Sequence, residues 1–192
     1  MKMLTTVASA AFSLTMFAAT PAFADFIDLT GHGSLNNSTS NHTLFSNDGT
    51  AINISAGSSN IGTSNLEGFG VKTSGGNLSG IQNNETLSFS FGNNVNVTGI
   101  SFRQWEGPDK ATLNSTFGSL TLNDDSCMFC SGQDFDLSLD GISSFNITGA
   151  SSLSVFYVSG ISFENAELPL PASAWLFGSA LLGLAAARKK KS

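Results

Sequence analysis

The sequence predicts an all-β protein. It consists of a β-sandwich or jelly-roll ectodomain over residues 25–167, an N-terminal signal peptide (1–24) and a C-terminal segment with one transmembrane helix (168–192). Three observations favour the sandwich. Apolar and polar residues alternate in short runs, turn-forming residues separate the runs, and residues 25–167 show almost no helical periodicity. Strands this short and regularly spaced are typical of sandwiches rather than of parallel βαβ sheets.

The N-terminus has the three parts of a secretory signal peptide. Lys2 is followed by an apolar run, and the segment ends in the small-x-small site Ala22-Phe23-Ala24. We expect the Sec translocon to export the chain and cleavage to follow Ala24, which leaves Asp25 as the new N-terminus. The alternative is a short membrane anchor. The apolar run is too short and too rich in Thr and Ser for one.

Residues 34–65 are less regular and rich in Ser, Asn, Thr and Gly. We expect loops around one or two short strands, with a low-complexity linker as the alternative. His32 and His42 are the only histidines, and both are expected at the surface.

The clearest strand covers residues 85–91. Its period of two places Leu87, Phe89 and Phe91 on one face, and Thr86, Ser88 and Ser90 on the other. The pattern continues over 95–105, where the expected buried residues are Val95, Val97, Ile100 and Phe102.

Later runs alternate in the same way. Their expected inward residues are Leu120 and Leu122; Phe135, Leu137 and Leu139; Phe145 and Ile147; Leu153, Val155 and Tyr157; and Ile161 and Phe163. About 140 residues are enough for two sheets, and the 16 Phe residues are the main core filler.

Charge excludes some partners. The net charge of the chain is −6, but the stretch from Asp25 to Glu167 contains 3 basic and 14 acidic residues, so its charge is 3 − 14 = −11. An acidic surface repels phosphate backbones, so we expect no nucleic-acid partner.

Cys127 and Cys130 form a C-x-x-C motif. Because an exported chain enters an oxidising compartment, a disulfide that shapes a loop is the expected state. Redox activity lacks the βαβ context, and a metal site would have only two of the four ligands that structural zinc needs; both remain alternatives.

Acidic residues flank these cysteines. Asp124, Asp125, Asp134 and Asp136 are solvated loop acids in the simplest interpretation. The alternative is a calcium site, because hard cations prefer oxygen ligands, although the spacing matches no EF-hand. Otherwise no cofactor is expected.

Four residues after the 95–105 strand suggest a sugar face. Arg103, Trp105, Glu106 and Asp109 combine an aromatic ring with polar groups that can orient hydroxyls. The alternative is a half-buried Trp that caps the sandwich.

Hydrolytic motifs are missing from the sequence. It contains neither a Gly-x-Ser-x-Gly elbow nor a His-Glu-x-x-His pair. We therefore expect no enzyme activity and keep a hydrolase only as the third hypothesis.

The C-terminal segment reads LPLPASAWLFGSALLGLAAARKKKS. Its uncharged stretch of about 20 residues, with a helix expected over 172–187, is long enough to cross a bilayer. Trp175 lies near one end, and the cluster Arg188, Lys189, Lys190 and Lys191 follows at the other. By the positive-inside rule this cluster remains cytoplasmic and stops transfer.

This segment resembles the VPLPA variant of the PEP-CTERM sorting signal. The matching parts are the motif Leu168, Pro169, Leu170, Pro171 and Ala172, the run WLFGSALLGL, and the basic tail. Leu168 replaces the usual Val. The resemblance implies a Gram-negative source, recognition by an exosortase, and cleavage near the Pro motif.

The ectodomain, over about Glu67–Glu167, resembles sandwich domains that PEP-CTERM proteins often carry. Together the two resemblances imply a non-enzymatic surface or extracellular-matrix protein, linked to extracellular polysaccharide or biofilm. They imply that it is anchored transiently in the inner membrane with its C-terminus cytoplasmic, and then reaches the cell surface or matrix. The alternative for the ectodomain is a carbohydrate-binding module, with or without calcium.

Overall fold

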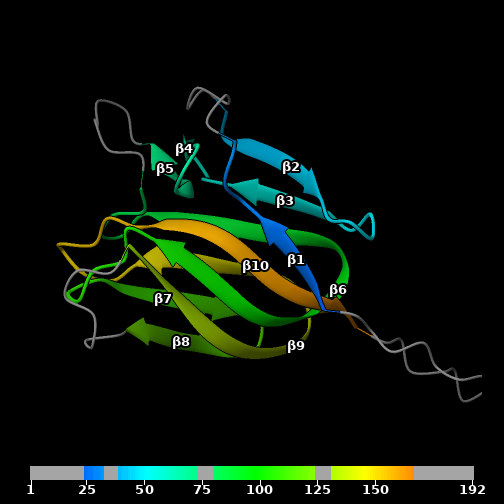
Figure 1. Cartoon of the computed structure of the whole chain (residues 1–192). Helices are drawn as coiled ribbons and strands as arrows, with labels where there is room; N and C mark the ends of the chain where they lie inside the picture. Colours follow the sequence, from blue (N-terminus) through cyan, green and yellow to red (C-terminus); the bar gives the residue numbers. More distant parts are fainter. Residues whose placement is uncertain (1–23, 33–38, 73–79, 124–130, 167–192) are drawn as a thin grey trace, which may run out of the picture.

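The computed structural model describes residues 24–32, 39–72, 80–123 and 131–166. These residues form ten strands and no helix, so the predicted all-β class is confirmed for this part of the chain (Figure 1). Within the same ranges no helix is long and apolar enough to cross a membrane. The signal peptide up to Phe23, the cysteines and the C-terminal segment lie outside the described residues, so predictions about them stay predictions.

Ten strands follow one another in the described ranges. In chain order they are β1 (Asp25–Asp28), β2 (Asn41–Phe45), β3 (Ala51–Ser55), β4 (Asn60–Ser64), β5 (Gly68–Lys72), β6 (Thr86–Arg103), β7 (Lys110–Ser115), β8 (Gly118–Asn123), β9 (Gly132–Gly149) and β10 (Tyr157–Asn165). All pairings between these strands are antiparallel.

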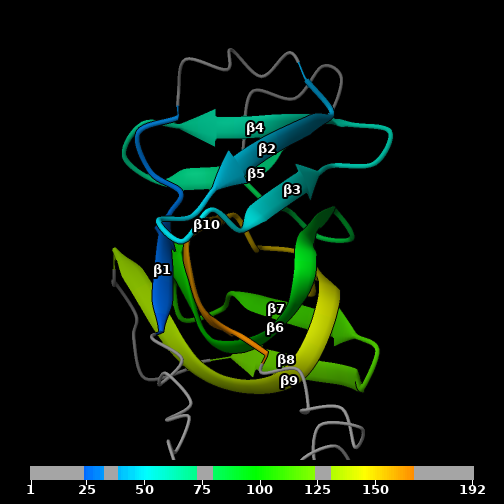
Figure 2. The same cartoon turned by 90° about the vertical axis from the view of Figure 1, so that its right-hand side faces the viewer.

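The ten strands form one hydrogen-bonded sheet that folds into two layers, the first and the second sheet below, and two long bent strands, β6 and β9, belong to both layers. The first half of β6 and the second half of β9 lie in a first sheet, with the order β2-β3-β6-β9-β7-β8. Their other halves lie in a second sheet with the order β9-β6-β10, where β10 pairs next with β1 and β5, and β5 pairs with β4. Figure 2 shows β6 and β9 curving together around the interior.

The bend of this pair coincides with turn-forming residues inside the strands. The β6–β9 register shifts between Ser90 and Gly99, where Gly92 and two asparagines interrupt the alternation. On β9, Gly141 has φ +64°, which glycine adopts without strain, and its N–H donates to the Asn96 side chain at 2.8 Å. Bulges of this kind bend strands and let them pass from one sheet to the other.

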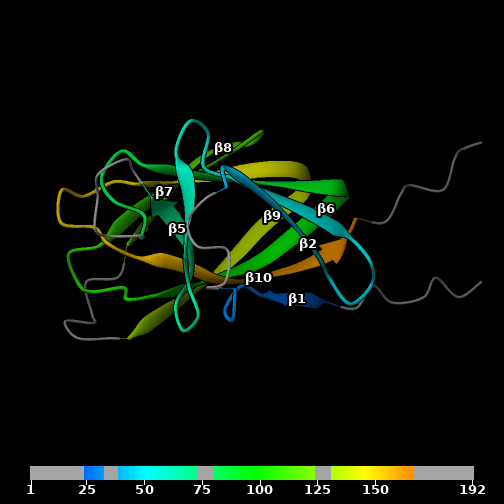
Figure 3. The same ribbon diagram turned by 90° about the horizontal axis from the view of Figure 1, so that it is seen from above.

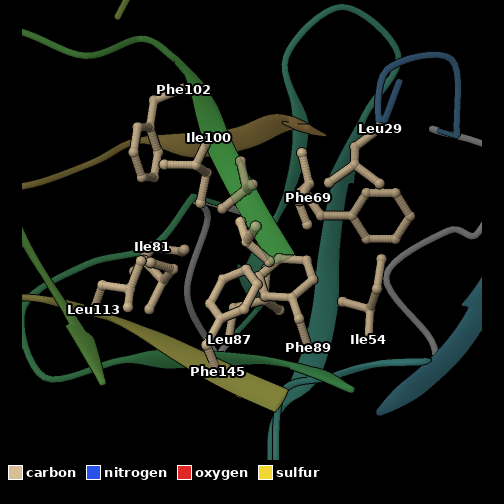
Figure 4. Close-up of a cluster of buried hydrophobic side chains, with 14 of the residues drawn as sticks. Leu29, Ile54, Phe69, Ile81, Leu87, Phe89, Ile100, Phe102, Leu113 and Phe145 are labelled. Atoms are coloured by element: carbon tan, nitrogen blue, oxygen red, sulfur yellow. The ribbon is translucent and has the colours of Figure 1, made fainter. Parts of the chain in front are cut away.

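The core lies between the layers and is rich in phenylalanine. Phe89 and Phe145 stack with ring centroids 5.0 Å apart, and Figure 4 shows them among the aliphatic residues of both sheets. Phe91 reaches across to Phe163 of the second sheet at 5.5 Å. These contacts join the layers through aromatic pairs, which add to the energy of burial itself.

The predicted faces of β6 are confirmed. Leu87 and Phe89 are fully buried and Phe91 is 7% exposed, whereas Ser90 is exposed and Thr86 and Ser88 are partly so. The four predicted inward residues of the second half, Val95, Val97, Ile100 and Phe102, are buried as well.

Other predictions need correction. Residues 34–65 contain three strands, β2, β3 and β4, rather than one or two. Leu120, on the edge strand β8, is exposed, whereas Leu122 on the same strand is buried as predicted. Leu153 is exposed in a turn and Val155 is half-buried, whereas Tyr157 is buried as predicted, together with Phe156 just before β10 and Val158 within it.

The start of β1 and the end of β10 lie at one end of the molecule. Asp25 pairs with Phe163, and β1 then follows β10 in the opposite direction (Figures 1 and 3). Asp48, in the β2–β3 turn, joins this turn to both strands by hydrogen bonds. Its carboxylate accepts from Asn165 and Thr50, and its N–H donates to Asp25.

Candidate binding groove

A groove of about 500 Å³ crosses the outer face of the second sheet. Its lining comes from β1 and the residues after it, the end of β6, the start of β9, and β10. These residues are Phe26, Asp28, Thr30, Ser101, Phe102, Arg103, Ser131, Gly132, Gln133, Asp134 and Ser159. The volume falls within the range of small-molecule sites.

The cross-strand register explains why the surface is hollow here. Asp134 of β9 lies opposite Ser101 of β6, Ser101 opposite Gly160 of β10, and Gly160 opposite Asp28 of β1. The two central positions of this row are small and the two outer ones are aspartates. A low floor between two acidic rims results, with about 4.8 Å from strand to strand.

Phe26 covers one side of this floor. The side chain is 49% exposed, and its ring lies over Gly160 so closely that any side chain there would collide with the ring. One face of the ring therefore packs on the sheet while the rest remains open to the groove. An exposed aromatic ring held in one position is a suitable stacking platform.

Arg103 borders the groove from the end of β6. Its side chain extends along Gly132, where an added Cβ would lie 3.2 Å from the Arg103 Cδ. The guanidinium makes no hydrogen bond or ion pair with a described residue and influences Asp28 only through space. Its five N–H donors therefore remain available among the described groups.

Asp28 offers an acceptor on the opposite rim. Thr30 donates to its Oδ1 from both the backbone N–H at 2.8 Å and the hydroxyl at 2.7 Å. These hydrogen bonds, first of all the one from the Thr30 hydroxyl, lower the pKa of Asp28, so it stays ionised. Oδ2 has no hydrogen-bond partner among the described residues and can accept from a ligand.

The sugar face expected around Trp105 is not formed, which corrects that prediction. Trp105 is fully buried, with its ring about 5 Å from the rings of Phe102, Phe135 and Phe156. The cause is Gln104, whose φ of +54° is left-handed and interrupts the alternation. Strict alternation would place the Trp105 side chain on the face opposite to that of Phe102. The left-handed backbone of Gln104 instead places both side chains on the inner face.

The Asp109 carboxylate binds the backbone of its own loop, and the Glu106 side chain is exposed outside the groove lining. Asp109 is 2% exposed, and its carboxylate accepts from the Glu106 N–H at 2.7 Å and the Val155 N–H at 3.3 Å. Burial raises the pKa of Asp109 above its ordinary value. Of the four residues predicted for a sugar face, the structure therefore leaves only Arg103 at a cavity.

The candidate calcium ligands are only partly described. Asp134 and Asp136 are exposed on one face of β9, two residues apart, whereas Asp124 and Asp125 lie outside the described residues. In the described ranges no three His, Cys, Asp or Glu side chains gather as a metal site.

The histidines lie closer together than expected. His32 and His42 both pack against Phe69, with their ring centroids 6.1 Å apart, and both are partly buried. Burial, and secondarily the nearby His32, lower the pKa of His42. Their aromatic neighbour makes this pair part of the packing at the edge of the sandwich.

Phe26, Asp28 and Thr30 are among the groove residues that sequence reasoning missed. Their alternation with buried Ile27 and Leu29 was the available signal, since it places all three on the outer face of one short strand and its extension. That β1 lies beside β10, and not elsewhere, is a long-range pairing that the local pattern does not contain.

Comparison of the sequence with protein-family models and with curated proteins gave no match in either case.

Proposed function

We propose that this chain is an exported, non-enzymatic surface or matrix protein whose ectodomain is sorted by an exosortase. The observation that carries the proposal is the C-terminal segment, in which a Pro motif at 168–172, an uncharged stretch and the cluster at 188–191 follow one another. The N-terminal signal peptide supplies the export step that such sorting requires.

The arrangement of the ectodomain is compatible with both processing events. The residue expected to follow the signal-peptide cut, Asp25, pairs with Phe163, three residues before the last described residue. Both expected cleavage regions therefore adjoin the same end of the sandwich. Neither cut would remove a strand, so the β-sandwich would remain intact as the mature protein.

The groove begins near that end at Phe26, the neighbour of Asp25, and extends away from it toward Arg103. Arg103 pairs with Tyr157, which is eight residues before Asn165 on β10, or about 26 Å along an extended strand. In a protein attached through its C-terminus, the Arg103 end of the groove would therefore face the surroundings rather than the membrane.

Mass spectrometry of the C-terminal peptide from surface-located protein tests the proposal. We expect the mature form to lack Arg188–Ser192, because exosortase cleavage near the Pro motif removes the helix and the basic tail. A Pro171→Ala variant is the matched control and should retain the tail in the membrane fraction. An intact basic tail on wild-type protein at the surface would leave a plain single-pass anchor and refute sorting.

A further inference from the structure

We propose that the groove between β1 and β9 binds a neutral hexose unit of a polysaccharide, with Phe26 as the stacking platform and Arg103 and Asp28 as the hydrogen-bonding groups. The proposal concerns the ectodomain alone and stands independently of how the protein is sorted.

The chemistry of the rims matches a polyhydroxylated ring. A sugar hydroxyl can donate and accept at once, and the groove offers both counterparts: guanidinium donors on Arg103 and the open Oδ2 of Asp28. Asp134 adds a second acceptor on the β9 side. The C–H face of a pyranose is apolar and flat, which suits the exposed part of the Phe26 ring.

The floor leaves room for such a ring. Ser101 has a small side chain and Gly160 lies under the Phe26 ring, and the next row on the same face continues with Gly99 and Ser162 before it reaches Phe26. The floor that stays open therefore runs from Ser101 to Gly99, beside the Phe26 ring rather than beneath it. A chain can therefore continue past the bound unit, as a polysaccharide requires.

The charge of the groove selects between neutral and acidic sugars. Arg103 is the one cationic side chain in the lining, against the carboxylates of Asp28 and Asp134. The described part of the ectodomain is acidic as well, so a uronate would meet net repulsion. A neutral sugar can make hydrogen bonds to Arg103, Asp28 and Asp134 without placing a negative charge beside the two carboxylates.

The backbone next to Arg103 is held in place by a hydrogen bond between strands. The left-handed Gln104 follows it directly and donates from its N–H to the Ser131 carbonyl at 3.0 Å, which ties the end of β6 to the start of β9. Strained residues that the surrounding structure holds in place are typical of pre-organised sites.

Affinity electrophoresis of the full chain tests the proposal, in a detergent without a sugar headgroup. The gels contain a neutral β-glucan, a galactomannan or, as the acidic comparator, polygalacturonate. We expect at least one neutral polymer to retard the protein and polygalacturonate not to. Retardation by polygalacturonate alone, or by no polymer, would overturn the proposal.

Three variants place the binding in the groove. Phe26→Ala should weaken the retardation about tenfold or more, as is usual when an aromatic anchor is truncated. Ser101→Phe fills the floor from the outer face without touching the core, so it should abolish binding at an unchanged unfolding midpoint. The control Phe117→Ala removes a ring that is 69% exposed outside the groove lining and should bind like wild type. Wild-type retardation of both groove variants would refute the site.

Discussion

The inner faces of the two sheets are both apolar, but their outer faces differ in charge and shape. On the first sheet, the outward positions of β6, β9 and β7 are occupied by Ser, Thr and Asn, in rows such as Thr86–Thr148–Thr112 and Ser88–Asn146–Asn114. On the second sheet, the corresponding row is Asp134–Ser101–Gly160–Asp28, bordered by Phe26 and Arg103. The same two long strands thus carry an uncharged surface on one half and a charged, hollow one on the other.

This difference separates two tasks of the molecule. Both inner faces serve stability, because burial of apolar area is the main favourable term in folding. The uncharged outer face makes side-chain hydrogen bonds of its own, such as the one between the hydroxyls of Thr86 and Thr148 at 2.9 Å. The second outer face instead leaves donors and acceptors available, which is the property that recognition needs.

The largest expected effect on stability comes from a substitution in the core between the two sheets. Phe89→Ala should lower the free energy of unfolding by about 3–5 kcal/mol, because it leaves a cavity beside Phe145. Denaturant unfolding measures the loss.

Ser88→Ala is the matched control on the adjacent position of the same strand. Its side chain lies on the outer face, so the change should stay within about 0.5 kcal/mol of wild type. A greater loss from the Ser88 change than from the Phe89 change would mean that the two faces of β6 are exchanged.

A smaller loss of stability is expected from a substitution in the loop between β6 and β7, at the end of the second sheet. Asp109→Ala leaves the N–H groups of Glu106 and Val155 without their acceptor, which should cost about 1–3 kcal/mol in denaturant unfolding. Asp134→Ala, at an exposed carboxylate on the groove rim, is the control and should change stability little. Equal losses would show that the rim contributes to folding, and the division between stability and recognition would fail there.

The smallest expected effect is a pH dependence at the edge of the first sheet. The pKa of His42 in the folded protein lies below its ordinary value of 6.5, so the unfolded chain binds more protons in this range. Stability should be complete above about pH 7 and decrease as pH falls through 6.5 toward the lower folded pKa. Unfolding midpoints from pH 8 to 5.5 measure it, with His42→Gln as the comparison. An unchanged slope in that variant would assign the dependence to other groups.

Much of the fold could be predicted from local alternation, and much of the site could not. Leu87, Phe89 and Phe91 were placed correctly because a period of two is a property of the strand itself. The prediction for Trp105 is wrong because one left-handed residue, Gln104, inverts the alternation. A positive φ at this position cannot be predicted from the residue type Gln. The groove depends on which strands are neighbours, and that choice is made by long-range pairing of β1 with β10 and of β9 with β6.

The position of β10 has a mechanical consequence. This strand contributes Ser159 to the groove lining and leads into the C-terminal segment, with eight residue pairs joining it to β6. Under the proposed attachment and binding, tension from a held polymer would pass along β10 in the strand direction. Hydrogen bonds between antiparallel strands are perpendicular to that direction, so the ladder would be loaded in shear, with its bonds sharing the force instead of opening one after another.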